Sequence, residues 1–184
     1  DKVDARRIAL LYRFQELRTT NIPNDDIECL RSLCRQYYKL NDELTAYKNR
    51  LTGIVDQLML NFKDVFSNMF SKAAMAVLEE YPTPVHILRA NRNKLISLIR
   101  KNSRRSIKWA TAKYELLVSK ARDFAPLSIH NPSNIAMLRV YISMIRTMEE
   151  NLEKVFMAIR KLIAEDMSKD MPTLALTLEL LQSL

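Results

Sequence analysis

The sequence contains one glycine, two cysteines and two histidines among 184 residues, and each low count excludes a class of protein. Tight hairpins and phosphate-cradling loops depend on glycine, because glycine alone enters left-handed backbone conformations at little cost. The single Gly53 therefore argues against a β-rich fold and against a P-loop or dinucleotide-binding fold. His86 and His130 lie far apart, without neighbouring ligands at metal spacing, so they predict neither a metal site nor a Ser-His-Asp or Cys-His arrangement.

Long apolar runs and patterned cysteines are also missing. No run reaches the roughly 20 apolar residues that a membrane-spanning helix needs, and no signal-peptide pattern is present. Cys29 and Cys34 are five apart on one expected helix and would point to different faces, so a disulfide between them is not expected. Two thiols without a pattern are typical of a reducing compartment. We therefore expect a cytoplasmic protein with no membrane contact.

Two long stretches place apolar side chains at alternating steps of three and four, which is the heptad spacing of a coiled coil. The first seam consists of Leu30, Leu33, Tyr37, Leu40, Leu44, Tyr47, Leu51, Ile54 and Leu58. The second seam consists of Leu138, Tyr141, Ile145, Met148, Leu152, Val155, Ile159 and Leu162. The sequence predicts an all-α fold, a long antiparallel helical hairpin or coiled coil with a small helical subdomain inserted at its tip. Whether the seams pair within one chain or between chains stays open.

Cap residues and prolines set the expected boundaries. Thr83-Pro84 and Asn131-Pro132 each place a helix cap before a proline that suits the first helical position. We expect a first coiled-coil helix at 24–62, an inserted subdomain at 63–131 and a second coiled-coil helix at 132–170. Gly53 lies inside the first helix, where it either permits close backbone approach or is tolerated at a cost of about 1 kcal/mol against alanine.

The positive charge is concentrated in one part of the chain. The net charge is +8, yet residues 89–122 carry eleven Lys and Arg side chains and one carboxylate, a local net charge of +10. Such a concentration indicates a polyanionic partner. The candidates for phosphate contact are Arg100, Lys101, Arg104, Arg105 and Lys108. Trp109, which is interleaved with them, is expected in the core and not as a base-stacking platform.

Two carboxylates stand at the start of the chain. Asp1 and Asp4 are three apart before a helical pattern, which places them on one helix face roughly 5–6 Å apart at Cβ. Acids near a helix start commonly interact with the helix dipole, and this pair can hold a divalent cation only if further acids come from elsewhere. Because the chain begins with an acid and not with Met, we expect a piece of a longer protein.

Four short segments carry a resemblance to a known family. They are Asp1-Lys2-Val3-Asp4-Ala5, Lys48-Asn49-Arg50-Leu51, Tyr81-Pro82-Thr83-Pro84 and Leu180-Leu181-Gln182-Ser183-Leu184. In this order and spacing they resemble the last acidic motif, the coiled-coil basic signature, the YPTP segment and the lead into the Pro-Gly-Ile-Gly motif of one family. That family is the DEDD-type insertion-sequence transposases of the IS110 type, relatives of the pilin-gene invertases.

The resemblance implies a function. Residues 1–20 would end an RNase H-like (RuvC-like) nuclease domain, with Asp1 and Asp4 as catalytic acids that help to hold Mg²⁺ in the intact protein. Residues 172–184 would lead into a further domain that carries a nucleophilic serine. Family members recombine DNA under the direction of a structured bridge RNA, so the expected partners are DNA, this RNA and a second copy of the chain through the coiled coil. The further candidates for nucleic-acid contact are Arg6, Arg7, Lys48 and Arg50.

Two other classes of function stay open. A structural coiled-coil scaffold, or a general RNA- or DNA-binding helical module, would carry the same seams, and in a scaffold the positive charge would only confer solubility. An independent helical-bundle enzyme would need a complete catalytic site, and the sequence presents none. The resemblance therefore predicts a central region of a transposase that does not catalyse by itself.

Overall fold

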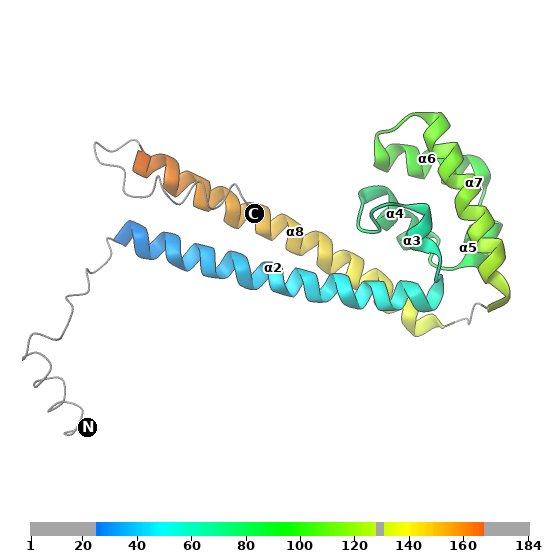
Figure 1. Ribbon diagram of the computed structural model, residues 1–184, viewed down its shortest axis with the longest axis horizontal. Helices are drawn as coiled ribbons and strands as arrows, with labels where there is room; N and C mark the ends of the chain where they lie inside the picture. The colour runs from blue at the N-terminus through cyan, green and yellow to red at the C-terminus, as the bar shows by residue number, and fades with distance from the viewer. Residues whose placement is uncertain (1–24, 128–130, 168–184) are drawn as a thin grey trace, which may run out of the picture. The chain divides into compact units, whose positions relative to one another are not determined.

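The computed structural model describes residues 25–127 and 131–167 (Figure 1). Within these ranges the backbone forms α-helices and one 3₁₀ turn and contains no strand, so the predicted all-α class is confirmed. The elements are α2 (Asp25–Leu58), α3 (Phe62–Val65), α4 (Lys72–Glu80), α5 (Pro84–Arg89), α6 (Arg92–Ser103), α7 (Ile107–Phe124), η1 (Ala125–Leu127) and α8 (Pro132–Met167). None of the helices in these ranges combines the length and the apolar character needed to cross a membrane.

The chain divides into two compact units, and the division falls within α2 and within α8. The larger unit, Gln36–Met157, contains all the helices from α3 to α7. In the described part of the other unit, residues 25–35 and 158–167, Leu30, Ile159 and Ile163 are buried. The candidate site lies in the larger unit, to which the following description is confined.

Within Gln36–Met157, α2 and α8 run side by side in opposite directions (Figure 1). The rings of Tyr37 and Phe156 lie 6.2 Å apart between centroids. Further along α2, the Asn134 side-chain amide donates a 2.8 Å hydrogen bond to the side-chain Oε1 of Gln57. Because an early residue of α2 pairs with a late residue of α8, the two helices run antiparallel in this unit.

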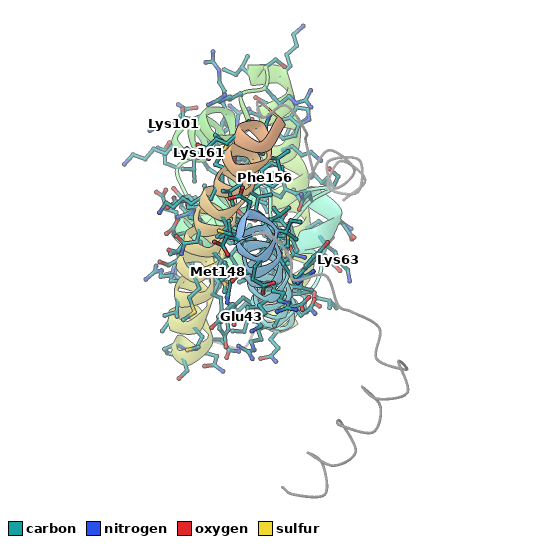
Figure 2. All side chains as sticks on the ribbon, turned by 90° about the vertical axis from the view of Figure 1, so that its left-hand side faces the viewer. Glu43, Lys63, Lys101, Met148, Phe156 and Lys161 are labelled. Carbon is teal, nitrogen blue, oxygen red and sulfur yellow. The ribbon has the colours of Figure 1, made fainter. Side chains whose placement is uncertain are left out.

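The heptad positions of this unit face inward. Six seam residues of this unit are buried, namely Leu44, Leu51, Leu58, Leu138, Ile145 and Leu152. The seam residues between them, among them Met148, which is labelled in Figure 2, are half-buried. Each fully buried leucine or isoleucine contributes about 1.5–3 kcal/mol relative to exposure. Burial of these apolar side chains is therefore the main contribution to the packing of α2 and α8 in this unit.

The helices between α2 and α8 form one core with them. Phe62, Leu78, Ile87, Leu95 and Leu117 each come from a different helix or helix end and are essentially inaccessible to solvent. An ion pair of 2.8 Å between Arg146 of α8 and Glu79 of α4 lies at the surface of this core. Since the apolar contacts link helices distant in sequence, they fix the orientation of α6 and α7.

Side-chain caps lie at the starts of α5 and α8, at the residues that the sequence predicts. The Thr83 hydroxyl accepts from the His86 backbone N–H at 3.4 Å, and Pro84 takes the first helical position of α5. The Asn131 side chain accepts from the backbone N–H groups of Ser133 and Asn134 at the start of α8. Both predicted cap-and-proline boundaries are confirmed. Each such cap stabilises its helix by about 1 kcal/mol.

We expect the substitution Gly53→Ala to stabilise the protein. Gly53 is an exposed residue in the interior of α2, and a Cβ atom built on it would meet nothing within 4 Å. Alanine should therefore raise the free energy of unfolding by about 0.5–1 kcal/mol through reduced backbone entropy in the unfolded chain. Urea unfolding followed by circular dichroism measures this change. A destabilised variant would mean that another chain approaches the backbone at Gly53.

Candidate nucleic-acid interface

Five exposed cations surround the connection between α6 and α7. We call this group the basic turn, and its members are Arg100, Lys101, Arg104, Arg105 and Lys108. Lys101 is labelled in Figure 2. None of the five forms an ion pair within the part of the chain that the structure describes. Their charge is therefore available to an external anion.

Local hydrogen bonds hold the backbone of the basic turn. The Arg104 N–H donates to the Arg100 carbonyl oxygen at 3.0 Å, and the Arg105 N–H donates to the Ser103 hydroxyl at 3.3 Å. The Ser106 hydroxyl then caps α7. Arg104 itself adopts φ 54° and ψ 24°, which is the left-handed conformation that helices commonly use for their last residue. This conformation costs about 1–2 kcal/mol for a residue with a Cβ atom.

A groove of about 400 Å³ lies beside the basic turn. Its residues come from the segment before α4, the start of α4, the end of α6, the basic turn and α7. They are Phe66, Ser67, Asn68, Ser71, Lys72, Ala73, Asn102, Ser103, Arg104, Arg105, Trp109 and Lys113. Hydroxyl, amide and cationic groups are prominent among them, and none is a carboxylate. We call it the α4–α7 groove.

Other cations of the basic segment are used inside the protein. The half-buried Lys113 donates a hydrogen bond to the backbone carbonyl of Val65, and its ammonium lies 5.7 Å from the centre of the Trp109 ring. The Lys120 ammonium lies 3.4 Å from the Asp64 carboxylate. These contacts join α7 to α3. The positive charge of residues 89–122 thus serves two purposes, internal packing on one face of α7 and an exposed surface at the basic turn.

The Trp109 side chain contacts both the hydrophobic core and the α4–α7 groove. It packs against the hydrophobic core, as predicted, but it is only half-buried and also contributes to the wall of the α4–α7 groove. The sequence prediction therefore identified one side of this residue and missed the other. The signal that points to the groove is the position of Trp109 in the first turn of α7, directly after the basic turn.

Lys48 and Arg50 make contacts of their own on α2 and with α8. The Lys48 ammonium forms a 2.9 Å ion pair with Glu149 of α8 and lies 5.5 Å from the centre of the Phe70 ring. Lys48 therefore links α2 to α8 within the protein. Arg50 is exposed, and its guanidinium lies 5.2 Å from the Tyr47 ring centre on the same helix.

The Tyr81-Pro82-Thr83-Pro84 segment forms a packed joint between α4 and α5. Thr83 is buried, and its hydroxyl lies 2.6 Å from Nδ1 of His86. Burial raises the pKa of the Tyr81 phenol, and the neighbouring Glu80 carboxylate raises that pKa further. The geometry assigns this segment a structural part in starting α5.

The remaining predicted site residues, Asp1, Asp4, Arg6 and Arg7, lie outside the described residues. The whole of the predicted segment 1–20 and the helix expected at 172–184 also lie outside the described residues. Within residues 25–127 and 131–167, no group of three or more His, Cys, Asp or Glu side chains is arranged to hold a metal ion. The acidic pair therefore stays a prediction.

Comparison with protein families gives one match. The model of the DEDD transposases of the IS110 type, described as a transposase family, matches residues 1–60. The matched region contains Asp1, Asp4, Arg6, Arg7, Lys48 and Arg50, and it reaches the end of α2. Neither the comparison with curated proteins nor the comparison with solved structures gives a match.

Proposed function

Because residues 1–60 of this chain match the model of the DEDD transposases of the IS110 type, we propose that the chain forms the central, nucleic-acid-contacting region of an insertion-sequence transposase. The observation that carries the proposal is the basic turn, whose five cations are exposed and lack acidic partners in the described structure. A transposase acts on DNA, and a cationic surface of this kind neutralises phosphates.

The side chains of the basic turn suit contacts with the nucleic-acid backbone. Arg100, Arg104 and Arg105 present planar guanidinium groups that bind phosphate oxygens in pairs, whereas Lys101 and Lys108 act as mobile point charges. Such contacts position a nucleic acid without reading its base sequence. They suit both DNA and a structured guide RNA, which the resemblance names as the second partner. The proposal does not depend on Lys48, because its ammonium is paired with Glu149.

For α2 and α8 we propose coiled-coil pairing within one chain and assembly with a second copy. The antiparallel contacts between the two helices in Gln36–Met157 support the first part. Met137, Val140 and Met144 support the second part, because these apolar side chains are about 40% exposed and follow one another along α8 at steps of three and four. Such a stripe is typical of a helix that packs against another helix.

For the acidic pair we propose the role that the resemblance implies. Asp1 and Asp4 would supply two carboxylate oxygens to a divalent cation, the chemistry that Mg²⁺ prefers. The ion would stabilise charge at a phosphodiester during strand cleavage or transfer. Further acids of the family tetrad would complete the site.

The salt dependence of binding tests the proposal. We expect the chain to bind duplex DNA with a log–log slope of about −4.5, since each of five neutralised phosphates contributes about −0.9. Affinity should then fall roughly several hundred-fold between about 50 and 200 mM salt. Fluorescence anisotropy with labelled duplex DNA, and separately with a structured RNA hairpin, measures both quantities.

The alternative function is a scaffold whose positive charge confers solubility. It predicts no measurable binding of either nucleic acid even at the lower salt concentration. Binding with a slope near zero would also contradict the proposal, because it would show that phosphate neutralisation does not drive the contact.

A further inference from the structure

We infer that the α4–α7 groove is a binding pocket for one unpaired nucleotide, with its phosphate held by Arg104, Arg105 and Lys72 and its base stacked on Trp109. The inference rests on the proposed function and names the part of the nucleic acid that enters the protein. The ligand chemistry is a phosphate joined to an aromatic base. A single-stranded DNA segment and an RNA loop both provide it.

Charge gives the groove its selectivity for an anion. Arg104 and Arg105 of the basic turn and Lys72, the first residue of α4, all line the groove, so cations from separate elements converge on one space. No carboxylate is present among the lining residues to neutralise them. Phosphate oxygens form strong charge-assisted hydrogen bonds with such groups.

A second cavity, next to the α4–α7 groove, differs from it in the charge of its wall. It has a volume of about 890 Å³ and shares Lys72 and Asn102 with the α4–α7 groove. Its wall, however, also contains Glu149, Glu150 and Glu153 of α8, together with Arg146 and Lys154 of the same helix. Three carboxylates balance the three cations of that wall, whereas the wall of the α4–α7 groove carries cations alone, so a phosphate is favoured in the α4–α7 groove.

Trp109 provides the surface for the base. Its ring packs against the core on part of its surface, which fixes its orientation, and its half-buried position leaves part of it at the groove. Lys113, held by the Val65 carbonyl, adds a cation 5.7 Å from the ring centre. A fixed aromatic ring next to cations is the arrangement by which proteins stack bases of single strands.

The size of the groove favours an unpaired nucleotide over a duplex. A volume of about 400 Å³ lies within the range of small-ligand pockets and suits one nucleotide. Bases of a duplex are stacked and paired, so a duplex can present only its phosphates to the basic turn. Loops, bulges and single strands can place a base against Trp109.

The fluorescence of Trp109 reports on the occupancy of the α4–α7 groove, because Trp109 is the single tryptophan of the chain. The experiment titrates the full 184-residue chain at low salt with oligothymidylate and with oligouridylate, each about ten nucleotides long, and with a DNA duplex. Tryptophan emission and the anisotropy of a label on each nucleic acid are followed together. We expect saturable quenching with at least one of the single strands and binding without quenching for the duplex.

Two variants extend the test. Arg104→Gly removes the guanidinium while suiting the left-handed backbone at this position, so it should keep the fold and weaken single-strand binding about tenfold. The matched control is Arg122→Ala, which removes an exposed arginine outside the groove and should change single-strand binding less than about twofold. Melting curves of both variants verify that they are folded.

Each outcome decides the matter. Quenching by the DNA strand, the RNA strand or both supports the groove and identifies the source of the nucleotide. Single strands that bind by anisotropy but leave the emission unchanged, or an Arg104→Gly variant that binds them normally, would overturn the inference and leave the proposed function standing. Equal quenching by the duplex would also overturn it. Absence of binding by every nucleic acid would remove the proposed function, and the inference with it.

Discussion

Replacing Leu44 with aspartate should unfold much of the helical structure under mild conditions. Leu44 is 6% exposed and belongs to the core that also contains Leu51, Ile145 and Leu152. The substitution removes apolar contacts and places a carboxylate without a partner among aliphatic side chains, so we expect a loss of about 3–5 kcal/mol. For a protein of ordinary stability this is a large fraction of the total free energy of unfolding. Urea unfolding followed by far-ultraviolet circular dichroism measures the loss.

The control for this variant is Thr45→Asp, which introduces the same charge one residue further along α2 at an exposed position. The Thr45 hydroxyl donates a hydrogen bond to the Asn41 carbonyl of its own helix and has no described contact with another element. We expect this control to change stability by less than about 0.5 kcal/mol. Similar unfolding midpoints for the two variants would show that the seam at Leu44 is not buried in solution.

Reversing the charge of Arg104 and Arg105 together should weaken nucleic-acid binding about 100-fold at low salt. The double variant Arg104→Glu with Arg105→Glu removes two charge-assisted phosphate contacts, each worth a factor of about ten, and the new carboxylates repel phosphates. Both side chains are exposed and lack ion pairs in the described structure, so the melting temperature should stay nearly unchanged. Anisotropy titrations with duplex DNA and with a single strand measure the effect.

A second double variant controls for net charge. Arg89→Glu with Arg122→Glu changes the total charge by the same amount, also at exposed positions, but outside the basic turn. Because salt screens charges beyond about 10 Å, we expect a loss of about tenfold or less. Equal losses in the two double variants would mean that the whole positive field attracts the nucleic acid and that the basic turn has no special part in binding.

These predictions test separately the apolar packing of the protein and its exposed cationic surface. Leu44 tests the apolar seam that organises α2 and α8 in Gln36–Met157, and the arginine pair tests the surface that this organisation leaves exposed. A variant that loses binding and keeps its stability assigns function to the basic turn. A variant that loses both binding and stability shows that the substituted residue has a structural role.

Much of the helical arrangement could be predicted because its signals are local. Steps of three and four fix which face of a helix is apolar, and Leu51 and Ile145 are buried for that reason. Caps act within four residues, so Thr83 and Asn131 reveal the starts of α5 and α8 without any knowledge of the fold. The concentration of charge in residues 89–122 is likewise a property of the sequence.

Other features depend on residues that are distant in the chain. Nothing in the sequence near Lys113 indicates that its ammonium binds the Val65 carbonyl, because 48 positions separate them. The same is true of Lys48, whose partner Glu149 lies on α8. The sequence therefore predicts a nucleic-acid contact at Lys48 in the same way as at the other cations, since a lysine gives no local sign of whether a carboxylate will stand beside it.

The helical class, the inward faces of the long helices and the cationic segment can be predicted from the sequence, because helix periodicity, caps and net charge depend on neighbours within a few residues. The free cations and the position of Trp109 beside a groove lined by Arg104, Arg105 and Lys72 become visible only in the folded chain. Ion pairing and partial burial depend on side chains brought together from separate helices, and the packing of the apolar core determines which side chains meet.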